Sequence, residues 1–68
     1  MTEPLVSVVV ISYNSAATII ETLDSVKNQN YSNIQLVVAD DASSDNTVEL
    51  VRDWMNQKWK RTSQLYYK

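Results

Sequence analysis

The sequence predicts an α/β domain whose strands form a partial doubly wound parallel sheet in the order β-α-β-α-β. Two apolar runs have the length and near-continuous hydrophobicity of buried parallel strands. Each run is followed by a segment in which apolar residues recur at helical spacing. Strands that alternate with helices favour right-handed crossovers and a parallel sheet, and 68 residues suffice for one small domain.

The first strand and the first helix open the chain. Residues 6–11 (VSVVVI) are a β-branched run of strand length, and polar residues 12–15 interrupt it. Ser15 and Thr18 are alternative N-caps for the helix, and Thr18 with Glu21 fits a capping box. The apolar stripe of this helix comprises Ile19, Ile20, Leu23 and Val26.

Turn-forming residues 28–33 (NQNYSN) are expected to end this helix near Gln29. Because the chain has no glycine, an asparagine is expected to supply the left-handed conformation that often follows a helix. Tyr31 is expected to pack where the helix turns into the next strand.

The second strand is expected at residues 34–39 (IQLVVA), and a second helix follows it. The polar cluster 43–46 (SSDN) precedes this helix, and Ser44, Asp45 or Asn46 is expected to cap it. Asn46 with Glu49 again fits a capping box. The apolar residues of this helix, which we expect in the core, are Val48, Val51, Trp54 and Met55.

Charge is unevenly distributed along the chain, whose formal net charge is −2. Residues 1–51 hold seven acids and one base, whereas residues 52–68 hold five bases and one acid. Within this basic tail, alternation in residues 64–67 (QLYY) permits a short third strand. Cations that follow a helix complement its dipole, and the aromatic spacing matches no nucleic-acid module. A specific nucleic-acid partner is therefore not expected.

Missing residue types exclude several classes of site. The chain has no cysteine and no histidine, which removes disulfides, thiolate nucleophiles, the usual zinc sites and histidine bases. Without glycine it has neither a Walker loop nor a dinucleotide fingerprint. Its longest aliphatic run, residues 8–11, is far shorter than the roughly 20 residues that span a bilayer. A cytoplasmic chain without a transmembrane segment is expected.

Asp40 and Asp41 directly follow the second apolar strand. Ligands of open α/β sheets bind beyond the carboxyl ends of the strands, and neighbouring parallel strands would bring this pair beside the loop at residues 12–15. Carboxylates accept hydrogen bonds only, so the pair suits a nucleobase imide, sugar hydroxyls or metal-bound water. The alternative is a structural brace that bonds loop N–H groups, which we expect for no more than one of the two aspartates.

Three blocks of the sequence stand out together, namely residues 6–14 (VSVVVISYN), 25–31 (SVKNQNY) and 37–47 (VVADDASSDNT). In this order and spacing they resemble the N-terminal nucleotide-binding portion of family 2 glycosyltransferases, which have the GT-A (Rossmann-like) fold. Agreement among several blocks is stronger than any single motif. The resemblance covers roughly residues 5–55 and implies that residues 1–68 are the nucleoside-binding part of a glycosyltransferase domain.

The resemblance implies roles for residues at the strand ends. The two loops would hold the nucleoside of a nucleotide-sugar donor, a UDP-sugar above all. Asp41 would contact the uracil or equivalent base, and Asp40 would support it. An imide N–H facing a fixed carboxylate makes a charge-assisted hydrogen bond, which agrees with that role. The further nucleotide-binding residues implied are Ile11, Ser12 and Tyr13.

The resemblance also implies what this segment lacks. The metal-binding D-x-D element and the catalytic carboxylate of the family would lie beyond Lys68, so we expect no catalytic residue, no metal site and no turnover here. In the full-length enzyme, expected in the cytoplasm or at the cytoplasmic face of the membrane, Mn²⁺ or Mg²⁺ would assist departure of the diphosphate. Family members commonly have glycine at the position of Ala42, where positive φ would strain alanine.

Two other functions stay open. One is a stand-alone nucleotide-binding module without catalysis. The other is an assembly element that associates with itself or another chain through an exposed sheet edge and its aromatic tail. A receiver-type phosphoacceptor is excluded by resemblance, because its acidic pair follows the first strand rather than the second.

Overall fold

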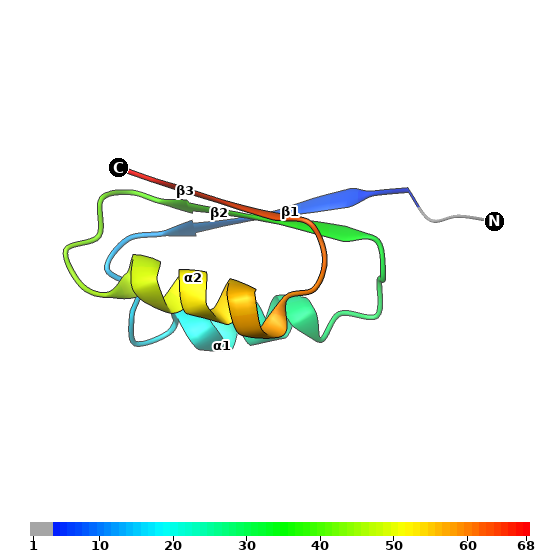
Figure 1. Ribbon diagram of the computed structural model, residues 1–68, viewed down its shortest axis with the longest axis horizontal. Coiled ribbons are helices and arrows are strands. Elements are labelled where there is room, and N and C mark those ends of the chain that lie inside the picture. Colours follow the sequence, from blue (N-terminus) through cyan, green and yellow to red (C-terminus); the bar gives the residue numbers. More distant parts are fainter. Residues whose placement is uncertain (1–3) are drawn as a thin grey trace.

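The computed structural model describes residues 4–68, which form three parallel strands and two helices (Figure 1). The sheet order is β1-β2-β3, with β2 paired in parallel to both neighbours. The predicted β-α-β-α-β order and parallel sheet are confirmed, and the third strand begins earlier than the sequence indicated. The elements are β1 (Val6–Ser12), α1 (Ile19–Lys27), β2 (Ile34–Asp40), α2 (Thr47–Lys58) and β3 (Ser63–Tyr67).

Both helices lie on one face of the sheet, below it in Figure 1. The strand order advances in one direction without reversing, so crossovers of the usual right hand place both helices on the same side. The core fills the space between this face and the helices. Its buried apolar side chains are Ile19, Leu23, Ile34, Leu36, Val38, Val51, Trp54 and Trp59.

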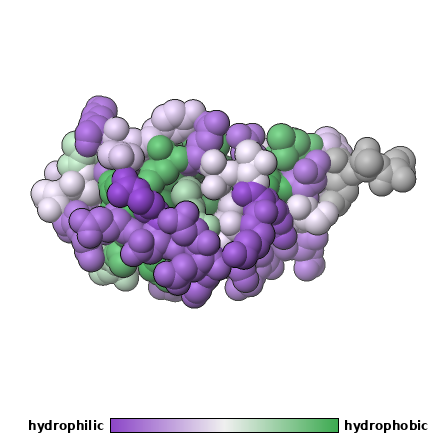
Figure 2. Space-filling model, viewed as in Figure 1, coloured by the Kyte–Doolittle hydropathy of each residue, from purple (hydrophilic) through white to green (hydrophobic). Residues whose placement is uncertain are grey.

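The opposite face of the sheet carries no helix in the described part of the chain. Along β1, Val8 and Val10 are half-buried against the core, whereas Val9 and Ile11 are exposed. The expectation that this strand is buried on both faces is therefore wrong for residues 4–68. Successive side chains of a strand point to opposite faces, and only one face is covered. By contrast, Figure 2 shows a largely hydrophilic surface over α2.

Helix capping agrees with the prediction at Asp45 but not at the two predicted capping boxes. Thr18 and Asn46 occupy the N-cap positions, but neither side chain makes a capping hydrogen bond, so both predicted capping boxes are wrong. Neither residue has the extended backbone that lets an N-cap side chain reach back to the helix. Asp45 caps α2 instead, because its Oδ1 accepts the Thr47 backbone N–H at 3.0 Å. Asn28, after α1, has φ −86°, so it does not adopt the predicted left-handed conformation.

Aromatic residues close the end of the core at which α2 terminates. Trp54 and Trp59 are both buried and stack with ring centroids 5.8 Å apart. The Trp54 indole N–H donates to Asp24 Oδ1 at 2.9 Å, and the Trp59 indole N–H donates to the Thr62 carbonyl at 3.1 Å. The predicted core roles of Trp54, Met55 and Tyr31 are confirmed, with the last two half-buried against the core cluster.

Candidate functional site

The carboxyl ends of all three strands gather at one end of the molecule, on the left in Figure 1, together with the β1–α1 and β2–α2 loops. The strand register aligns Ser12 of β1 with Asp40 of β2, and Asp40 with Tyr67 of β3. The Asp41 backbone N–H continues the alignment by donating to the Ser12 carbonyl at 2.9 Å. The two loops that the sequence predicted to be neighbours therefore lie side by side.

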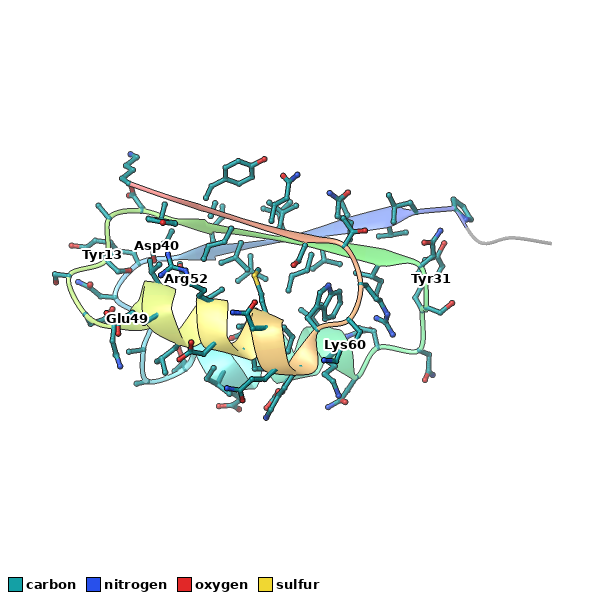
Figure 3. The ribbon with its side chains drawn as sticks, viewed as in Figure 1. Tyr13, Tyr31, Asp40, Glu49, Arg52 and Lys60 are labelled. Atoms are coloured by element: carbon teal, nitrogen blue, oxygen red, sulfur yellow. The ribbon has the colours of Figure 1, made fainter. Side chains whose placement is uncertain are left out.

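Asp40 ends β2 and is buried, with 5% of its surface exposed. The Ser12 hydroxyl donates to Asp40 Oδ1 at 2.7 Å. The Ser43 backbone N–H donates to Oδ2 at 2.8 Å, and the Ser43 hydroxyl also donates to Oδ1. Because both carboxylate oxygens are used inside the protein, Asp40 acts as the brace of this end of the molecule, where Figure 3 shows it.

The hydrogen bonds around Asp40 keep it ionised. Burial raises the pKa of its carboxyl, but the bonds from Ser43 and Ser12 lower it by more, and the net pKa lies below the ordinary value of 3.8. At neutral pH Asp40 is therefore a carboxylate that can only accept hydrogen bonds. An ionised side chain in this position holds the serine donors of both loops.

Side chains of the β2–α2 loop join it to the β1–α1 loop. The Ser43 hydroxyl accepts the Asn14 backbone N–H at 2.8 Å, and Asn14 Oδ1 in turn accepts the Ser44 backbone N–H at 2.7 Å. Thr47 Oγ1 accepts the Ser15 backbone N–H at 2.9 Å. These bonds between the loops fix one loop conformation relative to the other.

A second aspartate of the same loop contributes to this network. Asp45 Oδ2 accepts the Ala16 backbone N–H at 3.2 Å, and the Thr47 hydroxyl donates to Asp45 Oδ1. The hydrogen bond from the Thr47 side chain is the main reason that the pKa of Asp45 is lowered from 3.8. Asp45 thus joins the loops as well as capping α2.

Two residues of these loops adopt positive φ, Asn14 at 46° and Ala42 at 58°. Asparagine tolerates the left-handed region better than most residues, whereas alanine is strained there because its Cβ lies too close to the following carbonyl oxygen. Ala42 therefore takes the backbone conformation that glycine would favour, at the cost expected from the sequence. This conformation turns the chain sharply after Asp41 and lets Ser43 reach Asp40.

Asp41 lies on the surface of this end, in contrast to its buried neighbour. Its side chain is 66% exposed and makes an ion pair with Lys68, Nζ to Oδ1 at 3.1 Å. Ile11 and Tyr13 are also exposed, at 79% and 62%. Ser12 is buried and bonded to Asp40, so its side chain lies behind this surface rather than on it. The exposed strand-end surface consists of Ile11, Tyr13, Asp41 and Lys68.

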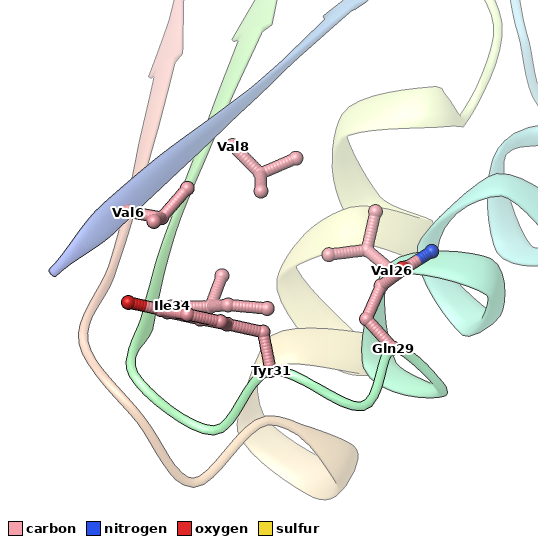
Figure 4. Close-up of a pocket in the computed structure, with 6 residues that line it drawn as sticks. All are labelled: Val6, Val8, Val26, Gln29, Tyr31 and Ile34. Carbon is pink, nitrogen blue, oxygen red and sulfur yellow. The ribbon is translucent and has the colours of Figure 1, made fainter. Parts of the chain in front are cut away.

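The described residues contain no group of three or more acidic, cysteine or histidine side chains that could hold a metal ion. A cavity of about 280 Å³ lies elsewhere, at the amino ends of the strands (Figure 4). Its lining is almost entirely apolar, and no chemistry-bearing cluster faces it. The cavity is lined by Val6, Val8, Val26, Gln29, Tyr31 and Ile34.

The sequence did not predict the hydrogen bonds that Asn14 and Ser43 make at this end of the sheet, or the ion pair of Lys68 with Asp41. Asn14 and Ser43 fit ordinary turn and cap roles, and Lys68 fits a solvated tail. The one available signal was that a serine three residues after Asp40 can bond back to it as a turn residue does.

Comparisons with known proteins agree with one another. The model of the family "Glycosyl transferase family 2" matches residues 7–63. The chain is 40% identical over its whole length to the Escherichia coli UDP-Glc:alpha-D-GlcNAc-diphosphoundecaprenol beta-1,3-glucosyltransferase WfgD, of which it covers 27%. It is also 38% identical to the Escherichia coli protein WfaP, which has the same enzyme description as WfgD. This match covers 69% of the chain and 19% of WfaP. The Putative glycosyltransferase EpsE of Bacillus subtilis is 37% identical over 75% of the chain and 18% of its own length.

The chain thus spans about a quarter or less of the length of these curated relatives. No solved structure matches it significantly. Neither of the helices in residues 4–68 has the length and apolar character needed to cross a membrane.

Proposed function

The chain belongs to glycosyl transferase family 2, and from this premise we propose that its strand-end surface binds the nucleoside of a nucleotide-sugar donor. The observation that carries the proposal is the difference in burial and hydrogen bonding between two adjacent aspartates. Asp40 is buried with both oxygens bonded inside the protein, whereas Asp41 presents an exposed carboxylate at the carboxyl ends of the strands. Asp40 positions the loop, and Asp41 contacts the ligand.

Asp41 suits the imide edge of a nucleobase. A carboxylate accepts hydrogen bonds only, and an imide N–H facing it makes a charge-assisted bond. The bond from the Asp41 backbone N–H to the Ser12 carbonyl fixes the backbone from which the carboxylate projects. Tyr13, exposed in the β1–α1 loop at the same end of the sheet, offers an aromatic ring on which a base can stack.

We further propose a UDP-sugar as the donor, and transfer of its sugar to an acceptor hydroxyl as the activity of the whole enzyme. WfgD and WfaP are both named for transfer from UDP-Glc. Residues 4–68 hold a binding surface but no cluster of side chains that fits a divalent cation. We therefore derive no metal-assisted step from them and expect these residues to bind nucleotide without turning it over.

Calorimetric titration with UDP tests the proposal. We expect binding heat with UDP and with uridine, and the same affinity in EDTA as with Mn²⁺, because the proposed contacts are made by Asp41 and its neighbours alone. Absence of heat with both ligands would contradict the nucleoside site. A strict requirement for Mn²⁺ would contradict the assignment of binding to these residues.

A second candidate function is assembly, which one specific observation favours. All-parallel sheets normally have both faces covered, and the described chain covers only one. None of the strand side chains that the register places on the bare face is charged, so a second copy of this chain can pack against them without like-charge repulsion. The register places on this face Ser7, Val9 and Ile11 of β1, Gln35, Val37 and Ala39 of β2, and Gln64 and Tyr66 of β3.

A further inference from the structure

We propose that Lys68 is a second base-contacting residue of the strand-end surface, and that with Asp41 it selects bases whose ring N–H adjoins a carbonyl. This inference rests on the proposed nucleoside site. The register pairs Asp40 with Tyr67, so Asp41 and Lys68 are the next residues along neighbouring parallel strands. Their side chains meet at 3.1 Å, from Lys68 Nζ to Asp41 Oδ1.

The pair is open to a ligand. The side chains of Lys68 and Asp41 are 77% and 66% exposed, and an exposed ion pair contributes only about 0–1 kcal/mol. A base that offers a partner to each group can therefore replace their mutual contact at little cost.

Strand β3, which Lys68 directly follows, is held in place from the helix side. Arg52 of α2 donates from Nη2 to the Tyr67 hydroxyl at 2.9 Å, and its guanidinium carbon lies 5.3 Å from the centre of the Tyr67 ring. These contacts tie the end of β3 to α2, which also starts at the braced loop. The backbone position of Lys68 at the strand-end surface is therefore fixed by the contact between Tyr67 and Arg52.

The two groups have complementary chemistry. Carboxylates only accept hydrogen bonds, and an ammonium group only donates them. Uracil and guanine present a ring N–H beside a carbonyl. The ring N–H can donate to Asp41, and the carbonyl can accept from Lys68. Cytosine in the same position presents an acceptor ring nitrogen to Asp41. Two acceptors, this nitrogen and the Asp41 carboxylate, would then face each other. The pair therefore favours UDP over CDP.

The test compares the wild-type protein with Lys68→Met and with the control Lys60→Met, each titrated with UDP, uridine and CDP. Lys60 carries the same charge and lies far from Asp40 (Figure 3). We expect Lys68→Met to weaken UDP and uridine by the same factor, about fivefold, which is the size of one hydrogen bond to a charged donor partly offset by solvent. The UDP preference over CDP should shrink in that variant, and Lys60→Met should bind as the wild type does.

Five results would overturn the inference. A loss for UDP without a loss for uridine would assign Lys68 to the diphosphate. A gain in affinity would show that Lys68 competes with the base for Asp41. Equal wild-type affinity for UDP and CDP would remove the selection. UDP binding that depends on Asp41 but not on Lys68 would overturn this inference alone, whereas no binding of UDP or uridine would overturn the nucleoside site with it.

Discussion

Ser12 and Asp40 face each other across the β1–β2 ladder, and a 2.7 Å hydrogen bond from the Ser12 hydroxyl to the Asp40 carboxylate joins the two loops that follow these strands. The bond is buried, so solvent does not weaken it. Asp41 follows directly, with its backbone N–H on the Ser12 carbonyl. The position of the exposed carboxylate therefore depends on an ionised, buried neighbour.

Acid should destabilise the protein through Asp40. Its pKa is lowered on folding, so its contribution to stability is present above the unfolded pKa near 3.8 and is lost as the pH falls through the lower folded value. We expect the free energy of unfolding to fall below about pH 4, and to fall less steeply in Asp40→Asn. Urea denaturation between neutral and strongly acid pH measures both slopes, and equal slopes would contradict the role of Asp40.

Replacing Ala42 with glycine should stabilise the protein. Ala42 has φ 58°, a region that costs an L-residue with a Cβ about 1 kcal/mol relative to glycine. We expect Ala42→Gly to raise the free energy of unfolding by about that amount. Ala39→Gly is the matched control, because glycine inside a strand lowers stability by roughly 0.5–1 kcal/mol. Destabilisation by both substitutions would argue against the positive φ at Ala42.

Asn14 has two separable roles, which two substitutions distinguish. Its side chain accepts the Ser44 backbone N–H, and its backbone has φ 46°. Asn14→Gly removes the side-chain hydrogen bonds from Ser44 without straining the backbone and should cost about 1 kcal/mol of unfolding free energy. Asn14→Ala also strains the backbone and should cost about 1 kcal/mol more. Chemical denaturation compares the variants, and equal losses would mean that the backbone conformation contributes nothing.

The bare sheet face predicts self-association of the protein at high concentration. Light scattering over a concentration series should show dimers of the wild type. Val9→Lys, which places a charge in the middle of β1 on the exposed face, should give monomers. Gln57→Lys on the outer surface of α2 adds the same charge away from this face and should leave the dimers intact. A wild-type monomer at every concentration would count against the assembly function.

The fold was largely predictable because its signals are local. Hydrophobic periodicity located both helices and two strands, and strand-helix alternation implied the parallel sheet. The capping interactions were not predictable in detail. The sequence marked Thr18 and Asn46 as candidate caps, but the backbone there lacks the conformation that capping needs. Trp59 follows the end of α2, so helical periodicity could not reveal its burial against Trp54.

The candidate site was predictable in its location but not in its internal order. Adjacent carboxylates after a strand pointed to a ligand edge, and the only local signal that separates Asp40 from Asp41 is Ser43, which bonds back to Asp40. Their difference also depends on a contact with Ser12, nearly thirty positions away. The pairing of Asp41 with Lys68 depends on the register of β3, which a five-residue strand with weak alternation does not reveal.

The most direct test of the nucleoside site is the affinity of Asp41→Asn for UDP, measured by calorimetry beside the wild type and the control Asp53→Asn. Asp53 is exposed on α2 and undergoes the same change of charge. We expect the fold to be retained in both variants. The affinity for UDP should fall about tenfold in Asp41→Asn, because a charge-assisted hydrogen bond becomes a neutral one. Asp53→Asn should bind UDP like the wild type. Wild-type affinity in Asp41→Asn would contradict the site.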